Sequence, residues 1–317
     1  MNILIGYDGS ECADAALREL KRAGLPSEAR SVVLTIADVW PPSPPGAEDN
    51  MSDLDQRIRE RVLELREADK RVLVEAGNKA AQAARIVQAS FPNWNVRSHA
   101  SADSPAWGIL KEADEWLADL IVLGSHGMSV TERLFIGSVS QRVMTHASCS
   151  VRVARERNER DDRPLRLIVG FDGSTDAQAA VFEVASRSWP KDTEIRVVTA
   201  VDQRMLSAIA ARVLRLRLSL ENGDNHDHEA WLETMTESAA ERLNAAELKA
   251  TSFIAQGEPK RVLLDSARDW EADCIFLGAT GLTGLRRLLI GSVSSAVTAH
   301  APCTVEVVRP RRLAESA

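Results

Sequence analysis

Two glycine-rich segments of this 317-residue chain have a spacing that could hold an anion. The first is Gly124-x2-Gly127-x9-Gly137-Ser138, and the second is Gly278-x2-Gly281-x9-Gly291-Ser292. Glycine lets the backbone approach a ligand closely. A Gly-Ser pair at the start of a helix adds unpaired N–H groups, a hydroxyl and the positive end of the helix dipole, all of which favour a phosphate.

A purely structural interpretation of these glycines is also open, because glycine is common at turns and a duplication preserves some matches. Against it, all three glycines recur in both segments although the residues between them differ. Two other phosphate-binding motifs are excluded. Neither segment contains a lysine, so the GK[ST] ending of a Walker A loop is missing, and no GxGxxG follows the first apolar run.

Two aspartates, Asp8 in YDGS and Asp172 in FDGS, follow the first apolar run of each half. In an open doubly wound sheet, ligands bind beyond the carboxyl ends of the strands. If the first and fourth strands are neighbours, each aspartate faces its own glycine segment and could hold a metal-bound water or a ribose or base donor. The alternative is that Asp-Gly-Ser only caps the following helix.

These residues belong to a chain that is written twice. NILIGYDGSECADAALREL matches RLIVGFDGSTDAQAAVFEV, and ADLIVLGSHGMSVTERLFIGSVS matches ADCIFLGATGLTGLRRLLIGSVS. A charged, proline-containing run separates the copies. We therefore expect one domain over 1–155, a linker over 156–164 and a second domain over 165–311.

Apolar runs alternate with helical patterns in each copy, which predicts an α/β fold. Strands are expected at 3–7, 31–39, 95–101, 119–123 and 149–155, and again at 167–171, 194–202, 250–256, 273–277 and 303–309. Helices are expected after Ser10 and Ser174, over about 53–90 and 203–248, after Pro105 and Pro259, and after each glycine segment. The fold class is two tandem open, mostly parallel five-stranded Rossmann-like sheets with helices on both faces.

Composition excludes several function classes. The formal net charge is −7, which argues against a nucleic-acid-binding surface. No apolar run approaches the ~20 residues that span a bilayer, and the N-terminus lacks a signal-peptide pattern, so we expect a cytoplasmic protein with no membrane partner. The four cysteines show no CxxC spacing, so a disulfide or zinc site is disfavoured.

Several further side chains have structural interpretations that we favour over chemical ones. His126 could sit beside a triphosphate, but we expect a solvent-exposed ring. His146 and His300 are expected to cap helix ends, and Trp116 and Trp270 to pack in the core. Metal binding by 225–229 (NHDHE) is disfavoured, whereas the apolar run 206–220 suits a partner-binding face and a helix packed on the sheet equally well.

The combination of motifs resembles the universal stress protein family. A strand ending in aspartate, an ADLIVLG strand, the G-x2-G-x9-G-S pattern and a final HAxC strand entry carry the resemblance over nearly the whole chain. In that family the glycine pattern marks the branch that binds ATP. The family's domains pair through their last strands, which implies that the two copies join as an intramolecular pseudo-dimer.

The resemblance implies a set of ATP-binding residues in each copy. Phosphates would bind the backbone at Gly137, Ser138 and Val139, with Ser140 one turn further. Gly124 and Gly127 would meet the ribose, Asp8 would face the nucleotide, and the backbone near Asp38 and Val39 would pair with adenine. The corresponding residues in the second copy are Asp172, Val201, Gly278, Gly281, Gly291, Ser292, Val293 and Ser294. No catalytic residue and no protein metal ligand are assigned.

The expected function is regulatory: ATP, with Mg²⁺, stabilises or switches a conformation. A slow Mg²⁺-dependent ATP hydrolase and an interaction scaffold without nucleotide stay open as alternatives. We expect an unidentified regulatory protein as a partner, and pairing of two chains into a homodimer also stays open.

Overall fold

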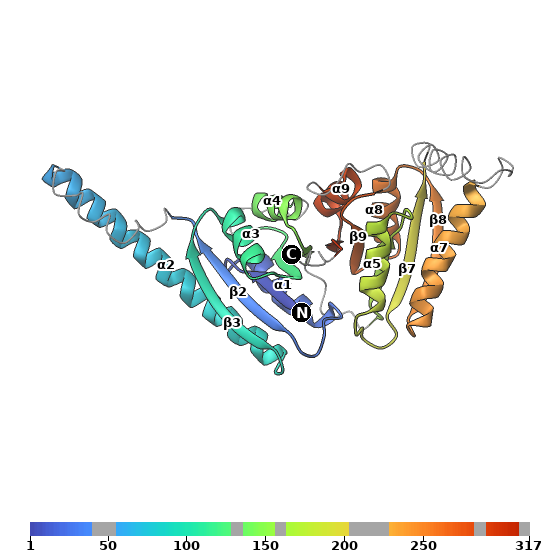
Figure 1. Ribbon diagram of the computed structural model, residues 1–317, viewed down its shortest axis with the longest axis horizontal. Coiled ribbons are helices and arrows are strands. Elements are labelled where there is room, and N and C mark those ends of the chain that lie inside the picture. The colour runs from blue at the N-terminus through green and yellow to red at the C-terminus, as the bar shows by residue number, and fades with distance from the viewer. Residues whose placement is uncertain (40–54, 128–135, 156–162, 203–227, 282–289, 311–317) are drawn as a thin grey trace, which may run out of the picture.

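The strands form one continuous ten-stranded sheet in the computed structural model, which describes residues 1–39, 55–127, 136–155, 163–202, 228–281 and 290–310 (Figure 1). The strand order is β3-β2-β1-β4-β5-β10-β9-β6-β7-β8. Neighbouring strands are parallel everywhere except between β5 and β10, which are antiparallel. The two predicted five-stranded sheets are therefore confirmed, as halves of a single sheet joined through their last strands.

Each half repeats the same order of elements. The first half contains β1 (Asn2–Gly6), α1 (Glu11–Glu19), a 3-10 turn (Leu20–Arg22), β2 (Arg30–Ala37), α2 (Gln56–Ser90), β3 (Asn95–Ala102), α3 (Pro105–Glu115), β4 (Leu120–Gly124), α4 (Ser138–His146) and β5 (Ser150–Ala154). The second contains β6 (Arg166–Gly170), α5 (Thr175–Ala185), β7 (Glu194–Val201), α7 (His228–Ala245), β8 (Lys249–Gln256), α8 (Pro259–Asp269), β9 (Cys274–Gly278), α9 (Ser292–His300) and β10 (Thr304–Val308).

Local sequence signals explain where these helices begin. The Ser10 and Ser174 hydroxyls accept hydrogen bonds from the amides of Ala13 and Ala177, both at 3.2 Å, so each serine caps its helix as predicted. Pro105 and Pro259 occupy the first turns of α3 and α8. The predicted features at 40–46, 206–220 and 225–227, and the side chains of residues 228–230, lie outside what the structure describes.

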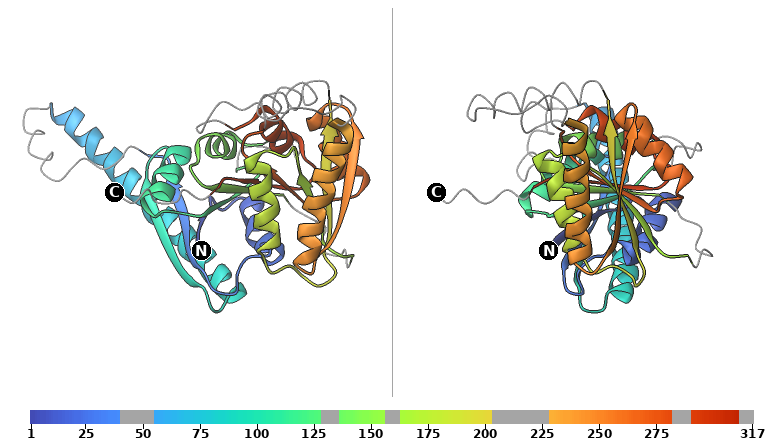
Figure 2. Two further views of the ribbon diagram at one scale, coloured as in Figure 1. Left: turned by 45° about the vertical axis from the view of Figure 1, so that its right-hand side comes forward. Right: turned by 90° about the vertical axis from the view of Figure 1, so that its right-hand side faces the viewer.

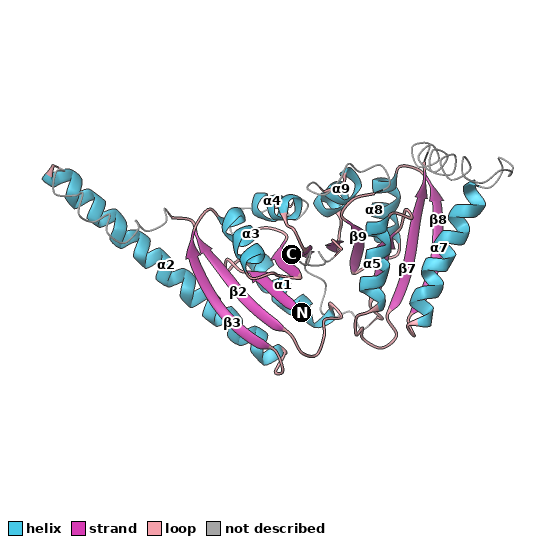
Figure 3. Ribbon diagram, in the orientation of Figure 1, coloured by secondary structure: helices cyan, strands magenta, loops and turns pink. Residues whose placement is uncertain are grey.

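Helices cover both faces of the sheet (Figure 3), and the sheet twists strongly when viewed end-on (Figure 2). On one face a single apolar cluster runs through both halves under α3, α4, α8 and α9. On the other face α1 and α2 cover the first half, and α5 and α7 cover the second. Trp116 and Trp270 pack against the shared cluster, which confirms their predicted core role.

The two halves meet along β5 and β10, and we call this junction the seam. The shared cluster continues across the seam, where α4 and α9 lie side by side (Figure 1). Arg155, which follows β5, donates to the carbonyl oxygens of Thr298 and Ala299 near the end of α9, at 3.2–3.3 Å. Arg309, which follows β10, donates to the carbonyl of Met144 near the end of α4, at 2.7 Å. Each half thus supplies a cation to the negative end of the other half's helix.

We expect Arg155→Ala to lower the free energy of unfolding by about 2–3 kcal/mol, because the buried guanidinium donates to carbonyls that no other side chain would then satisfy. Urea denaturation measures the change. The control is Arg268→Ala: its side chain is 57% exposed and pairs with Asp265, so the loss should stay below about 0.5 kcal/mol. Equal losses in the two variants would contradict the capping role of Arg155.

Candidate functional site

The Asp-Gly-Ser sequence after β1 forms a tight turn that is repeated after β6. Gly9 and Gly173 have φ values of +83° and +77°, which side chains other than glycine's rarely allow. The Ser10 amide donates to Asp8 Oδ1 at 2.9 Å, and the Ser174 amide donates to Asp172 Oδ1 at the same distance. The structural interpretation of this motif is therefore confirmed for the serine and for one oxygen of each aspartate.

The second oxygen of each aspartate faces the glycine segment. Because β1 pairs with β4, and β6 with β9, the turns after neighbouring strands meet at one edge of the sheet. A Cβ atom placed on Gly127 would lie 2.9 Å from Asp8 Oδ2, and one on Gly281 would lie 2.6 Å from Asp172 Oδ2. The expected juxtaposition of aspartate and glycine segment is present in both halves.

The third glycine brings the start of a helix to the same place. The Gly137 amide donates to Ser125 O at 2.7 Å, and the Gly291 amide donates to Ala279 O at 2.7 Å. This hydrogen bond closes the segment, so that a Cβ atom on Gly137 would lie only 3.7 Å from the Gly127 nitrogen. Gly137 and Gly291 are the N-caps of α4 and α9. The amides of the first helical turn, at Ser138 and Val139 and at Ser292 and Val293, have no partner within their helices.

Two of the predicted site residues in each half pack against the protein instead of facing open space. A Cβ atom on Gly124 would lie 2.7 Å from the carbonyl carbon and oxygen of Cys12, so glycine here lets β4 touch the first turn of α1; Gly278 has the same contact with Asp176. The Ser140 hydroxyl is buried and donates to Gly124 O at 2.8 Å. Ser294 donates to Gly278 O at 2.7 Å. These hydroxyls hold the end of a strand to the helix that follows it.

The residues predicted to pair with adenine lie further out along the second strand of each half. The register pairs Gly6 with Leu34, so β2 continues past the end of β1 before reaching Val39. The Val39 amide donates to Ala37 O at 2.8 Å, and Asp38 is exposed. In the second half Val201 is buried and its carbonyl accepts from the Gly257 amide at 3.0 Å.

The family model for the universal stress protein family matches residues 1–155 and 165–309 of this chain. The chain belongs to that family. A universal stress protein of Mycolicibacterium smegmatis is 26% identical over 329 aligned residues, which cover 98% of this chain and 97% of the relative.

Solved structures show the same fold over the whole length of this universal stress protein. A universal stress protein from Archaeoglobus fulgidus superimposes with a TM-score of 0.61 at 19% identity, covering 97% of this chain and 98% of its own. A Pseudomonas aeruginosa protein of unknown function superimposes with a TM-score of 0.55 at 14% identity, covering 98% and 92%.

The expectation that His126 is exposed is wrong. The residue is 6% exposed, Nδ1 lies 3.0 Å from the Ser125 hydroxyl, and Nε2 is buried with no hydrogen-bond partner among the described residues. Burial, together with the charge of Arg155, lowers the pKa of this histidine. Thr280 replaces it in the second half and donates through both its amide and its hydroxyl to Asp176, at 2.9 and 2.6 Å.

The two candidate sites also differ in the helix side chains that lie over the turn, which we call the wall of the site and which the sequence did not indicate. The side chain of Lys79 on α2 lies over the first turn, 3.5 Å from a Cβ atom placed on Gly9, and its Nζ pairs with Glu75 at 3.0 Å. In the second half Trp231 and Met235 on α7 occupy this place, 3.7 and 3.9 Å from a Cβ atom on Gly173. No motif marks these positions, because they come from long helices whose register against the turn is set by packing.

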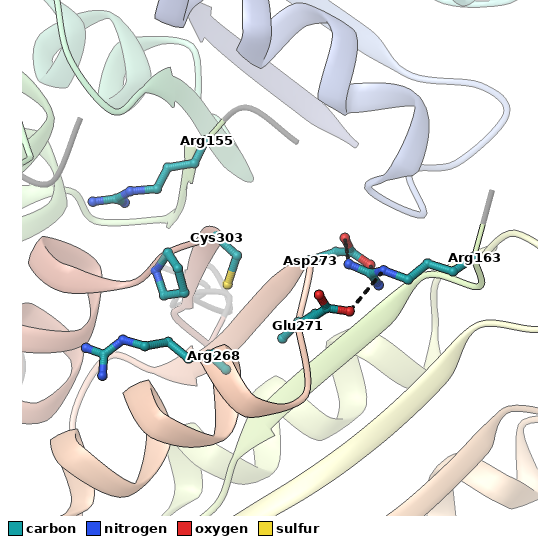
Figure 4. Close-up of a pocket in the computed structure, with 9 residues that line it drawn as sticks. Arg155, Arg163, Arg268, Glu271, Asp273 and Cys303 are labelled. Carbon is teal, nitrogen blue, oxygen red and sulfur yellow. Dashed lines mark hydrogen bonds and ion pairs between the residues drawn. The ribbon is translucent and has the colours of Figure 1, made fainter. Parts of the chain in front are cut away.

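A cavity of about 340 Å³ lies at the seam and not at the candidate sites (Figure 4). Arg155, Arg163 and Arg268 surround it with Glu271 and Asp273. Arg163 pairs with Asp273 at 3.1 Å and approaches Glu271 at 4.0 Å. Because the three arginines already interact with carboxylates or carbonyl oxygens of the protein, we interpret the cavity as part of the junction between the halves.

The remaining chemical predictions concern cysteines, metals and membranes. All four cysteines are free, and burial raises the pKa of Cys149 and of Cys303 to about 12 each. Within the described ranges there is no group of three or more His, Cys, Asp or Glu side chains that could hold a metal ion. Among those residues, too, no helix is long and apolar enough to cross a membrane.

We expect Gly124→Ala and Gly127→Ala to have different effects on the free energy of unfolding. The first places a methyl group against the Cys12 backbone, which cannot turn away, so we expect a loss of about 2–3 kcal/mol. The second meets only the end of the Asp8 side chain, so the loss should stay below about 1 kcal/mol. Urea denaturation measures both variants, and Gly278→Ala and Gly281→Ala repeat the test in the other half. A similar loss at both positions would refute the distinction.

Replacing His126 by threonine, the residue of the second half, should reduce the loss of stability in mild acid. The lowered pKa means that the unfolded chain binds a proton more readily than the folded one. The contribution of His126 therefore falls as pH drops below the ordinary histidine value of about 6.5. Unfolding free energies at pH 7 and 5 should differ less in His126→Thr, by at most about 1.4 kcal/mol per pH unit. An unchanged difference between the two pH values in His126→Thr would contradict this prediction.

Proposed function

We propose that each half of this universal stress protein binds one ATP with Mg²⁺, and that the bound nucleotide regulates the protein. The observation that carries the proposal is the convergence, twice over, of an aspartate oxygen, a glycine that leaves space beside it and a glycine-capped helix start. In each half three segments distant in sequence meet there, at the carboxyl ends of neighbouring parallel strands, where open α/β sheets bind ligands.

The phosphates would bind at the start of α4 and α9. The amides of Ser138 and Val139, and of Ser292 and Val293, have no partner within their helices and lie at the positive end of a helix dipole equivalent to roughly half a unit charge. Hydrogen bonds to an anion contribute about 1.5–3 kcal/mol each. Gly137 and Gly291 would let the phosphate approach, because a branched side chain there would stand over these amides.

Asp8 and Asp172 would orient the nucleotide. Oδ1 of each already accepts an amide hydrogen bond in its own turn, which orients the carboxylate. Oδ2 lies beside Gly127 or Gly281 and could accept from a ribose or base donor or from a metal-bound water. Mg²⁺, when bound with ATP, would neutralise phosphate charge. The ribose would lie beside Gly127, and the backbone near Val39 and Val201 would pair with adenine.

A regulatory role is favoured over catalysis by where α4 and α9 end. Each of these nine-residue helices begins at a candidate phosphate site and ends at carbonyls held by an arginine of the other half. Binding at the N-terminus of α4 would therefore stabilise the same element that Arg309 holds across the seam. Sensing of ATP needs no more than this, whereas hydrolysis would also need a group that positions and activates the attacking water.

Denaturing the purified protein should release nucleotide, and calorimetric titration with ATP and Mg²⁺ should give two sites per chain. Gly137→Val and Gly291→Val should each remove one site by blocking phosphate approach. Gly77→Ala is the control, because a Cβ atom on Gly77 meets nothing within 4 Å.

Two results would count against the proposal. Unchanged stoichiometry and affinity in either valine variant would reject the phosphate assignment for that half, and no bound nucleotide and no heat at all would favour the scaffold. Turnover above about one ATP per second would favour an enzyme.

A further inference from the structure

The two halves are repeats, so identical residues would be expected to face each other at the centre of the seam. The residues that meet there instead carry opposite charges. In the β5–β10 pair, Val151 lies opposite Val307, Arg152 opposite Glu306, and Val153 opposite Val305. Arg152 and Glu306 occupy the same position of the two repeats, so the pseudo-two-fold axis passes between them. Two first halves paired in this way would place Arg152 against Arg152, and two second halves would place Glu306 against Glu306.

This central pair is fully buried. Both side chains are 0% exposed, and Arg152 Nη1 lies 2.7 Å from Glu306 Oε2. Glu19 completes the pairing of Arg152, and Arg187 completes that of Glu306. Burial would raise the pKa of Glu306, but the Arg187 and Arg152 charges hold it below its usual value. Two like charges at this site would each lose the opposite charge across the axis and would repel each other, while keeping only the partner of their own half, Glu19 for Arg152 or Arg187 for Glu306. Such repulsion is destabilising where water is excluded.

A steric contact beside the axis carries the same asymmetry. Gly24 of the first half, at φ +64°, lies under the ring of Trp189 of the second, and a Cβ atom there would be 2.8 Å from the ring. The position equivalent to Gly24 in the second repeat is Ser188, and the one equivalent to Trp189 in the first is Leu25. Pairing of two second halves would therefore push a serine side chain into each tryptophan ring.

The hydrogen bonds beside this contact are also asymmetric, because the second half donates and the backbone of the first half accepts. The Ser188 amide donates to Gly24 O at 3.1 Å, and Arg187 Nη1 donates to Ala23 O at 2.9 Å. Ala23 stands at the position of Arg187 in the first repeat. Two first halves would therefore lose the arginine and the tryptophan together.

We propose that the seam is selective: the β5 edge of a first half accepts only the β10 edge of a second half, and neither edge pairs with its own kind. Arg152 and Glu306 are the specificity-determining charges, and Gly24 and Trp189 are the matching steric pair. A second copy of the chain can then use this surface only by exchanging unlike halves, never by joining like ones.

The test allows each half to pair with a half of either kind. A protease site is placed within 156–162, the folded chain is cleaved, and both fragments are unfolded together in urea and refolded by dilution. The intact chain, refolded in parallel, controls for refolding. Native mass spectrometry separates the three pairings by mass, since the two fragments differ in sequence and therefore in mass. We expect complexes of one first half with one second half, and like pairs at less than about a tenth of them.

Glu306→Arg should lower the abundance of the unlike complex at least tenfold, because it places two arginines at the buried axis. The control is Asp265→Arg, the same change of charge on an exposed face of the same half, which should leave pairing unchanged. Like pairs in statistical proportion, fragments that form no complex, or a Glu306→Arg protein that pairs as the wild type does would each overturn the proposal.

Discussion

The antiparallel contact between β5 and β10 is the constraint on which the remaining architecture depends. Among the described strands it is the one place where the parallel order of the sheet reverses, and it turns two five-stranded halves into a single sheet with one shared apolar cluster. Without it, β5 and β10 would each be a buried, apolar strand left at the edge of a sheet, and such edge strands tend to pair with other chains. Pairing of β5 with β10 covers both edges, and the buried Arg152 and Glu306 form an ion pair across it.

The same contact determines how α4 and α9 are held. Each helix begins at a glycine N-cap beside an aspartate and ends under an arginine from the opposite half. The candidate sites and the seam therefore meet on the same two helices, although no described side chain belongs to both.

Much of this arrangement could be predicted from the sequence, because it follows from local patterns. Alternating apolar runs and capping residues indicated the strands and helices, and the repeat indicated two equivalent halves. The meeting of Asp8 with Gly127 followed from one assumption about strand neighbours, which the β1–β4 pairing confirms. The role of Gly124 could not be inferred in this way, because its reason is a close approach of the Cys12 backbone from another helix. The burial of His126 depends on packing in the same manner, and a loop position in a polar sequence suggests the opposite.

The differences between the halves show which parts of the candidate site are free to vary. The turn, the three glycines and the helix start are retained. Gly9 and Gly173 adopt a positive φ that other residues rarely allow, and Gly124 and Gly278 leave no room for a Cβ atom beside the neighbouring helix. The surrounding wall has changed from Lys79 to Trp231 and Met235, and from His126 to Thr280, without altering the turn geometry. A wall that carries an ammonium group in one half and an indole in the other cannot offer a ligand the same surroundings. Because the backbone cradle is shared and the wall is not, the two sites would differ in affinity or in preferred nucleotide while binding the same phosphate group in the same way.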